Sequence, residues 1–125
     1  MAVAITSSQQ SSPFSVRTVR VTDIENTGLD DATGRGSRLY AIGCENDHGS
    51  ASAPAFVKLY DKVNPTYGTD NPYIILRVKH GFRDCWTIAQ GISLGSGISL
   101  MCATTAGKSN SGNPANPVNV NITST

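Results

Sequence analysis

Charged residues are scarce in this chain of 125 residues, and their scarcity excludes one class of partner. Only 15% of the residues are charged, and ten Lys and Arg against nine Asp and Glu leave a formal net charge of +1. A protein that binds nucleic acid by electrostatic attraction carries a basic excess on one face. We therefore expect no nucleic-acid partner.

Long apolar runs are also missing from the sequence. No segment approaches the roughly 20 consecutive apolar residues that a membrane helix needs. The opening residues, MAVAITSSQQSSPF, have neither a basic start nor a long apolar core. We therefore expect neither a signal peptide nor a membrane partner.

Cysteine is present but sparse. Cys44, Cys85 and Cys102 are an odd number and have no close spacing. A disulfide framework in a secreted protein needs an even and denser set. We expect three reduced, mostly buried thiols in a protein made in a reducing cytoplasm.

Residues that favour helices are few, whereas residues that favour strands are many. The chain has six Leu and two Glu, but Val, Ile and Thr together number 30. β-Branched side chains suit strands better than helices. This composition predicts an all-β protein.

Apolar and polar residues alternate with period two along most of the chain, and Gly, Pro, Asn, Asp and Ser separate the alternating segments. The pattern places Val19 and Val21 on one buried face, and Tyr40, Ile42 and Cys44 on another. It predicts Trp86 as a core residue. We expect a single-domain β-sandwich, jelly-roll-like, of seven to eight short antiparallel strands. The expected strands are 3–6, 16–24, 38–45, 55–62, 73–79, 85–89, 98–104 and 118–123.

A short internal repeat interrupts this regular spacing. The residues GISL occur at 91–94 and again at 97–100. Two copies are too few for a repeat protein. The repeat predicts two short strand segments, or one bulged strand, with a hinge at 95–97.

The first residues form a separate unit in this interpretation. Residues 1–13 are expected to be an N-terminal arm, and 14–125 the β-sandwich domain. Val3 and Ile5 lie in a short apolar segment that a Ser- and Gln-rich stretch separates from the domain. We expect this segment to pair with a neighbouring chain; the alternative is an ordinary first strand of its own sandwich.

Several patterns suggest chemistry but lack the context that each chemistry needs. Ser93 lies in a G-x-S-x-G pattern, yet no helix is predicted after it and both histidines precede it. Lys108 and Ser109 follow a glycine as in a phosphate-binding loop, but Cys102 stands where the leading glycine is required. We therefore expect no enzymatic activity, no catalytic residues and no cofactor.

Two further groups of residues could hold a metal or act as an acid/base pair. The segment 44–48 (CENDH) has no second pair of ligands to close a zinc site, so we expect no metal. Asp61 and Asp70, or Asp30 and Asp31, could form an acid/base pair, but aspartates are ordinary in turns.

The residues from 54 onward resemble a known family. The segments AFVKLYDK (55–62) and NPTYGTDNP (64–72), then an apolar strand, a Gly-rich hairpin, a TTAG turn and an alternating last strand, are similar to small structural proteins of tailed bacteriophages. The resemblance covers residues 54–123. It implies a virion accessory protein, either a capsid decoration (cement) protein or a tail component.

The resemblance and the composition together give two functional hypotheses. The first is a capsid decoration protein on the capsid surface of the virion, which binds the major capsid protein and itself, as a dimer or trimer, and stabilises the shell. The alternative is a tail-associated receptor- or glycan-binding module, in which Tyr67, Asp70 and Tyr73 line a carbohydrate site. The candidate interface residues are Val3, Ile5, Phe14, Tyr67 and Tyr73.

Overall fold

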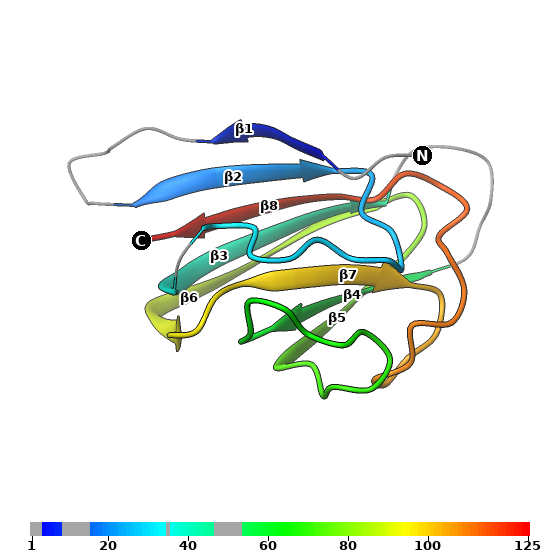
Figure 1. The fold of residues 1–125 in the computed structure, drawn as a ribbon. Coiled ribbons are helices and arrows are strands. Elements are labelled where there is room, and N and C mark those ends of the chain that lie inside the picture. The colour runs from blue at the N-terminus through cyan, green and yellow to red at the C-terminus, as the bar shows by residue number, and fades with distance from the viewer. Residues whose placement is uncertain (1–3, 9–15, 35, 47–53) are drawn as a thin grey trace.

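The computed structural model describes residues 4–8, 16–34, 36–46 and 54–125. These ranges contain eight strands and no helix, so none of them holds a helix that could cross a membrane (Figure 1). The all-β prediction is confirmed. The strands are β1 (Ala4–Ser8), β2 (Arg17–Thr22), β3 (Ser37–Asn46), β4 (Ala55–Tyr60), β5 (Ile74–Val78), β6 (Phe82–Leu94), β7 (Ser99–Ala103) and β8 (Asn119–Ser124).

The strands form two antiparallel sheets that face each other (Figure 1). The larger sheet has the order β1-β2-β8-β3-β6, and the smaller has the order β5-β4-β7. The last strand, β8, lies between β2 and β3, which joins the end of the chain to its beginning. The architecture is a β-sandwich, as the alternating segments predicted.

The core lies between the sheets and is made by the inward residues of each alternating strand. Val19 and Val21 are buried as predicted, and they face the buried side chains of β4 and β7. Burial of apolar area at about 25 cal/mol per Å² is the main force that holds such sheets together. The buried apolar core also contains Leu39, Ile42, Cys44, Val57, Leu59, Leu100, Cys102, Val120 and Ile122.

One face was predicted wrongly in β3. The buried residues are Leu39, Ile42 and Cys44, whereas Tyr40 is only half-buried. The pairing with β6 is irregular here, since Leu39 pairs with Ile92 but Ala41 pairs with Thr87. This bulge shifts the alternation by one residue and turns Tyr40 away from Ile42 and Cys44.

The Arg38 side chain stabilises the bulge. The Arg38 guanidinium donates hydrogen bonds to the carbonyl oxygens of Gln90 and Gly91, at 2.7 and 3.1 Å. Gly91 has a φ of 74°, and a Cβ at that position would collide with the Arg38 side chain. The first GISL repeat therefore belongs to a bulged β6, and the second leads into β7 after the predicted hinge.

A second buried cluster lies on the outer face of the smaller sheet. Tyr60, Met101 and Ala103 are buried there, with Tyr67 packed against them. Lys58 is also fully buried on β4, and its ammonium donates a 2.5 Å hydrogen bond to the Ser109 carbonyl oxygen. The loop that follows β7 thus covers a face that alternation alone would leave exposed.

The two sides of the sandwich differ. The free edge of β7 is closed by the loop after β2, because Leu29 and Leu100 exchange backbone hydrogen bonds and Ala32 donates to Ile98. On the other side β5 and β6 each end their sheet and contact each other. We call this the open side, defined by Ile74 and Leu76 of β5 and by Phe82, Trp86 and Ile88 of β6.

The N-terminal segment folds back on its own chain. Residues 4–8 form β1, which pairs antiparallel with β2 at the edge of the larger sheet. This is the alternative that the sequence left open, and the expected pairing of this segment with another chain is not what the structure shows. Val3 and Phe14 lie outside the described residues, and of Ile5 only the backbone is described, paired with Val21.

The cysteine and tryptophan predictions held in part. All three cysteines are free thiols, and Cys44 and Cys102 are buried. Cys85 is exposed, which corrects the expectation for that residue: it pairs with Gly43 on the outer face of the larger sheet. Trp86, one residue later, packs against the core but is only half-buried because β6 is an edge strand.

Candidate functional site

A concavity lies where β4 ends and the loop to β5 returns. Tyr60 is the last residue of β4, and Tyr73 immediately precedes β5. The Tyr73 amide donates a 2.7 Å hydrogen bond to the Leu59 carbonyl oxygen, which brings the two ends of the loop together. The resulting cleft of about 440 Å³, here called the tyrosine cleft, is lined by Tyr60, Asp61, Lys62, Asp70, Asn71, Pro72 and Tyr73.

Turn chemistry holds the loop in shape. The Asp70 carboxylate accepts a 2.8 Å hydrogen bond from the Thr66 amide and lies 3.1 Å from the Lys62 ammonium. These two contacts lower the pKa of Asp70, so the carboxylate stays ionised at neutral pH. Asp61 accepts a 2.9 Å hydrogen bond from the Ser96 amide. The two aspartates that the sequence could not place together therefore line one cleft.

Tyr67 stands beside the cleft and supports it. Its ring packs edge-on against Tyr60 with a centroid separation of 5.2 Å, and its hydroxyl donates a 2.6 Å hydrogen bond to Asp30. Burial and the Asp30 carboxylate both raise the pKa of Tyr67. Gly28 leaves room for the ring, since a Cβ there would overlap it. Tyr67 is thus a structural residue, whereas Asp70 and Tyr73 reach the cleft itself.

The Tyr60 hydroxyl is the unusual polar group of this site. Tyr60 is 1% exposed although it lines the cleft, so it forms part of the floor. Its hydroxyl has no hydrogen-bond partner among the described residues. Burial and the nearby Asp70 charge raise the pKa of this hydroxyl, which keeps it protonated and able to donate. Sequence reasoning missed Tyr60 because it lies in a strand, not in the loop.

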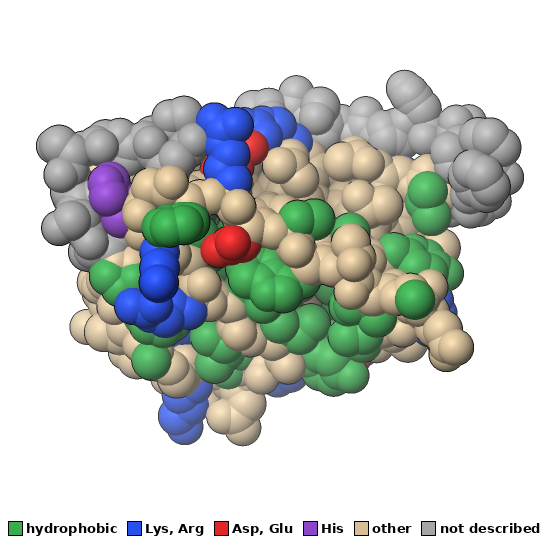
Figure 2. Space-filling model, turned by 180° about the vertical axis from the view of Figure 1, so that it is seen from behind, with side chains coloured by type: hydrophobic (Ala, Val, Ile, Leu, Met, Phe, Trp, Pro, Cys, Tyr) green, Lys and Arg blue, Asp and Glu red, His purple; other side chains and the backbone are tan. Residues whose placement is uncertain are grey.

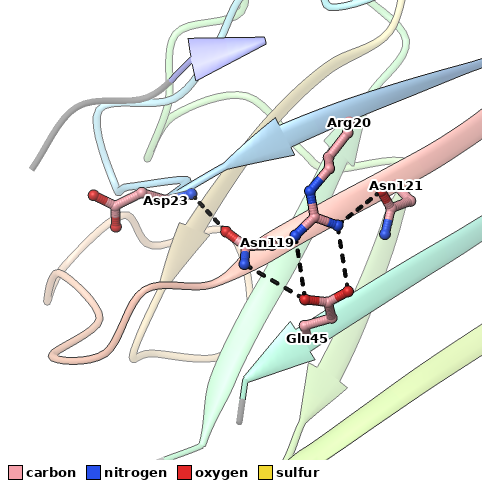
Figure 3. A network of polar contacts seen from close by, with 5 residues as sticks. All are labelled: Arg20, Asp23, Glu45, Asn119 and Asn121. Carbon is pink, nitrogen blue, oxygen red and sulfur yellow. Dashed lines mark hydrogen bonds and ion pairs between the residues drawn. The ribbon is translucent and has the colours of Figure 1, made fainter. Parts of the chain in front are cut away.

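A second polar assembly lies on the outer face of the larger sheet and links three strands (Figure 3). The Arg20 guanidinium of β2 lies 3.3 Å from the Glu45 carboxylate of β3 and donates to Asn121 of β8. Asn119 donates to Glu45 and accepts from the Asp23 amide, where φ is 55°. Hydrogen bonding to Arg20 lowers the pKa of Glu45. This network fixes strand register.

A shallow groove of about 290 Å³ runs beside this network. Its floor includes Gly43, where an added Cβ would meet only ordinary van der Waals contacts. Ala41, Cys85 and Thr123 also line it. Charged side chains stand at its border, since Glu45, Arg83 and Asp84 line it as well.

The other chemical candidates are dispersed. Ser93 is exposed in β6, and His80 lies 3.2 Å from the Asn116 amide. His48, from the segment 44–48, lies outside the described residues. Across the described ranges no three His, Cys, Asp or Glu side chains come together in a way that could hold a metal ion.

Comparison with known proteins adds no relative. No family model, no curated protein and no solved structure matches this chain.

Proposed function

We propose that this chain is a structural accessory protein of a tailed-bacteriophage virion, and that it decorates the assembled capsid and stabilises it through protein–protein contacts. The resemblance of residues 54–123 to small phage structural proteins supports the virion part of the proposal. The open side supports the contact part.

The open side carries the proposal because it leaves apolar area at a strand edge. Phe82 is 52% exposed, and Trp86 and Leu76 are only partly covered by the core. Figure 2 shows hydrophobic side chains gathered across the middle of the back face, with an acidic side chain among them and basic side chains beside them. Edge strands of monomers are usually protected by charges, prolines or a covering loop. Exposed apolar area at a strand edge fits a protein partner.

The sequence of β6 supports the proposal that the open side contacts another protein. From Cys85 to Gly107 the chain has no charged residue and no histidine. Burial of β7 explains the second half of this stretch, since all five of its residues are buried. It does not explain the part of β6 from Cys85 to Leu94, which follows the charged Arg83 and Asp84 and whose edge is unpaired in the described structure. We assign the capsid shell as the occupant of this edge.

The stabilising mechanism is linkage. A protein that binds the assembled shell and not its separated subunits shifts the equilibrium toward the shell, in proportion to its concentration over its dissociation constant. No catalytic group is needed for this activity.

The test compares phage particles with and without this protein under heat and osmotic shock. We expect particles that lack it to release DNA at a lower temperature, and added protein to restore the resistance. Equal resistance of the two kinds of particle would refute the stabilising role.

A pair of variants tests the surface. Phe82→Asp places a charge on the open side, and Val63→Asp places one at a comparably exposed site, 41% against 52%. Val63 lies beside Gly97, outside β5 and β6. We expect Phe82→Asp to lose shell binding and Val63→Asp to retain it. Binding by both variants would show that the open side is not the contact.

A further inference from the structure

We infer that the tyrosine cleft binds a neutral saccharide, with one pyranose ring stacked on Tyr73. This activity is separate from shell binding: the cleft lies at the start of β5, next to Ile74, whereas Phe82 of the open side follows the other end of that strand. Three features of the cleft support it.

The first feature is an exposed aromatic ring at the rim. Tyr73 is 55% exposed, which is unusual for so large a side chain. No hydrogen bond or ring contact of its side chain occurs among the described residues, while its backbone amide is fixed to Leu59. An exposed aromatic face on a fixed backbone offers apolar area to the C–H face of a sugar, with a hydroxyl at its tip for polar contact.

The second feature is a set of polar groups that remain available around that ring. Asp61 uses one carboxylate oxygen for Ser96 and keeps the other. The Asn71 amide is exposed and makes no hydrogen bond within the described ranges. The Lys62 ammonium adds a donor. Because these side chains lie on one loop, they offer both donors and acceptors to the hydroxyls of a bound sugar.

The third feature is a fixed floor, made by the buried Tyr60. The Tyr67 ring packs edge-on against the Tyr60 ring, with the centroids 5.2 Å apart, and so holds it in place. A fixed apolar floor below a rim of polar side chains suits a ligand that stacks through one face and forms hydrogen bonds at its edge.

Charge selects the class of sugar. Two carboxylates, Asp61 and Asp70, face one ammonium, Lys62, which leaves the cleft with a net negative charge. An anionic sugar such as a sialic acid, or a phosphate, would be repelled. A neutral hexose or N-acetylhexosamine meets no such penalty.

The experiment is an NMR titration of the full chain with methyl β-galactopyranoside, methyl α-glucopyranoside and N-acetylglucosamine, with N-acetylneuraminic acid as the anionic comparison. We expect millimolar binding of at least one neutral sugar, with amide shifts confined to residues 60–73, and no binding of the anionic one. No shift with any neutral sugar at 50 mM would overturn the inference.

Variants assign the binding to the cleft. Tyr73→Ala should weaken it by at least about fivefold, whereas Tyr73→Phe keeps the ring and should stay within about twofold. Phe82→Ala removes a similarly exposed aromatic ring outside the cleft and should change nothing. Binding that survives Tyr73→Ala unchanged, or that falls equally with Phe82→Ala, would refute the site.

Discussion

The Cys102 thiol should make the protein sensitive to alkali in a way that one substitution removes. Cys102 is fully buried in β7, and burial raises its pKa from 9.0 to about 12, against smaller opposing effects of Lys58 and the Phe56 backbone. The folded-state pKa lies above the unfolded value. The stabilising effect of the neutral thiol is therefore complete below about pH 9 and is lost as the pH rises toward 12.

The size of the effect follows from this shift. At about pH 10.5 the unfolded thiol is almost fully ionised while the folded thiol is not, which removes about 2 kcal/mol from the free energy of unfolding. Cys102→Ala leaves a small cavity and should cost about 1–2 kcal/mol near pH 7. Because alanine does not ionise, the variant should equal or exceed the wild type in stability near pH 10.5.

The free energies of unfolding of the two proteins are measured by urea unfolding at a series of pH values between 7 and 10.5. Tryptophan fluorescence follows the transition. Tyr60, whose pKa is also raised, lowers the stability of both proteins alike and cancels in the difference. Cys102 contributes to the raised pKa of Cys44, so its removal also reduces the alkaline loss of stability from Cys44, which favours the variant at high pH in the same direction. Leu100→Val is the matched control, because it truncates a fully buried residue on the same face of β7 without a titrating group. A deficit of Cys102→Ala that stays constant with pH, like that of the control, would refute the reasoning.

Three further substitutions test other parts of the fold. Trp86→Ala should lower the free energy of unfolding by about 1–3 kcal/mol, less than for a fully buried tryptophan, because β6 leaves the ring half-covered; an unchanged denaturation midpoint would place the ring off the core. Gly112→Ala should lower the melting temperature more than Gly107→Ala, since both have a positive φ but only at Gly112 does a Cβ collide with Thr104; equal losses would contradict this difference. Glu45→Gln should cost under about 1 kcal/mol at pH 7. Its lowered pKa means that the contribution of Glu45 is present above its ordinary value of 4.5 and is lost as the pH falls through the lower folded-state pKa, so the difference between the two melting temperatures should shrink on acidification; a difference that stays constant would contradict this.

The strands themselves could be predicted because their alternation reports burial on one face. Val19 and Val21 of β2, and Val120 and Ile122 of β8, lie in the core as a simple period of two requires. These strands lie in the middle of the larger sheet, where both neighbours hold the register. Local sequence and tertiary environment agree there.

The prediction failed where a distant contact decides the face. Tyr40 is displaced by a bulge that depends on Arg38 reaching Gln90 and Gly91 across the sheet. Lys58 is buried only because the Ser109 segment lies over it. Cys85 was expected to be buried by alternation, but an edge strand has one covered face, and pairing with Gly43 puts this thiol on the other. None of these partners lies near in the sequence.

Only some residues of the tyrosine cleft could be predicted from the sequence. Asp70 and Tyr73 could be named because loops rich in Pro, Gly and Asp expose their side chains. Tyr67 belonged to the same loop, yet its ring turned inward to Tyr60 and Asp30. The signal for Tyr60 was its position as the last aromatic residue of β4, directly before that loop.

The contrast between β6 and β7 explains why the uncharged stretch from Cys85 to Gly107 bears on function. Both strands contain part of this stretch, and both lie at the edge of a sheet. For β7 the absence of charge is required by folding, since every residue is buried and the loop after β2 completes its hydrogen bonds. For β6 folding makes no such demand: most of its residues are accessible, and lysines on its outer face would protect the edge at little cost to stability. Selection for a soluble monomer alone would favour those charges. β6 carries Arg83 and Asp84 at its start, but from Cys85 to Leu94 it carries no charge, which is what the proposed contact with another protein requires of this part of the strand.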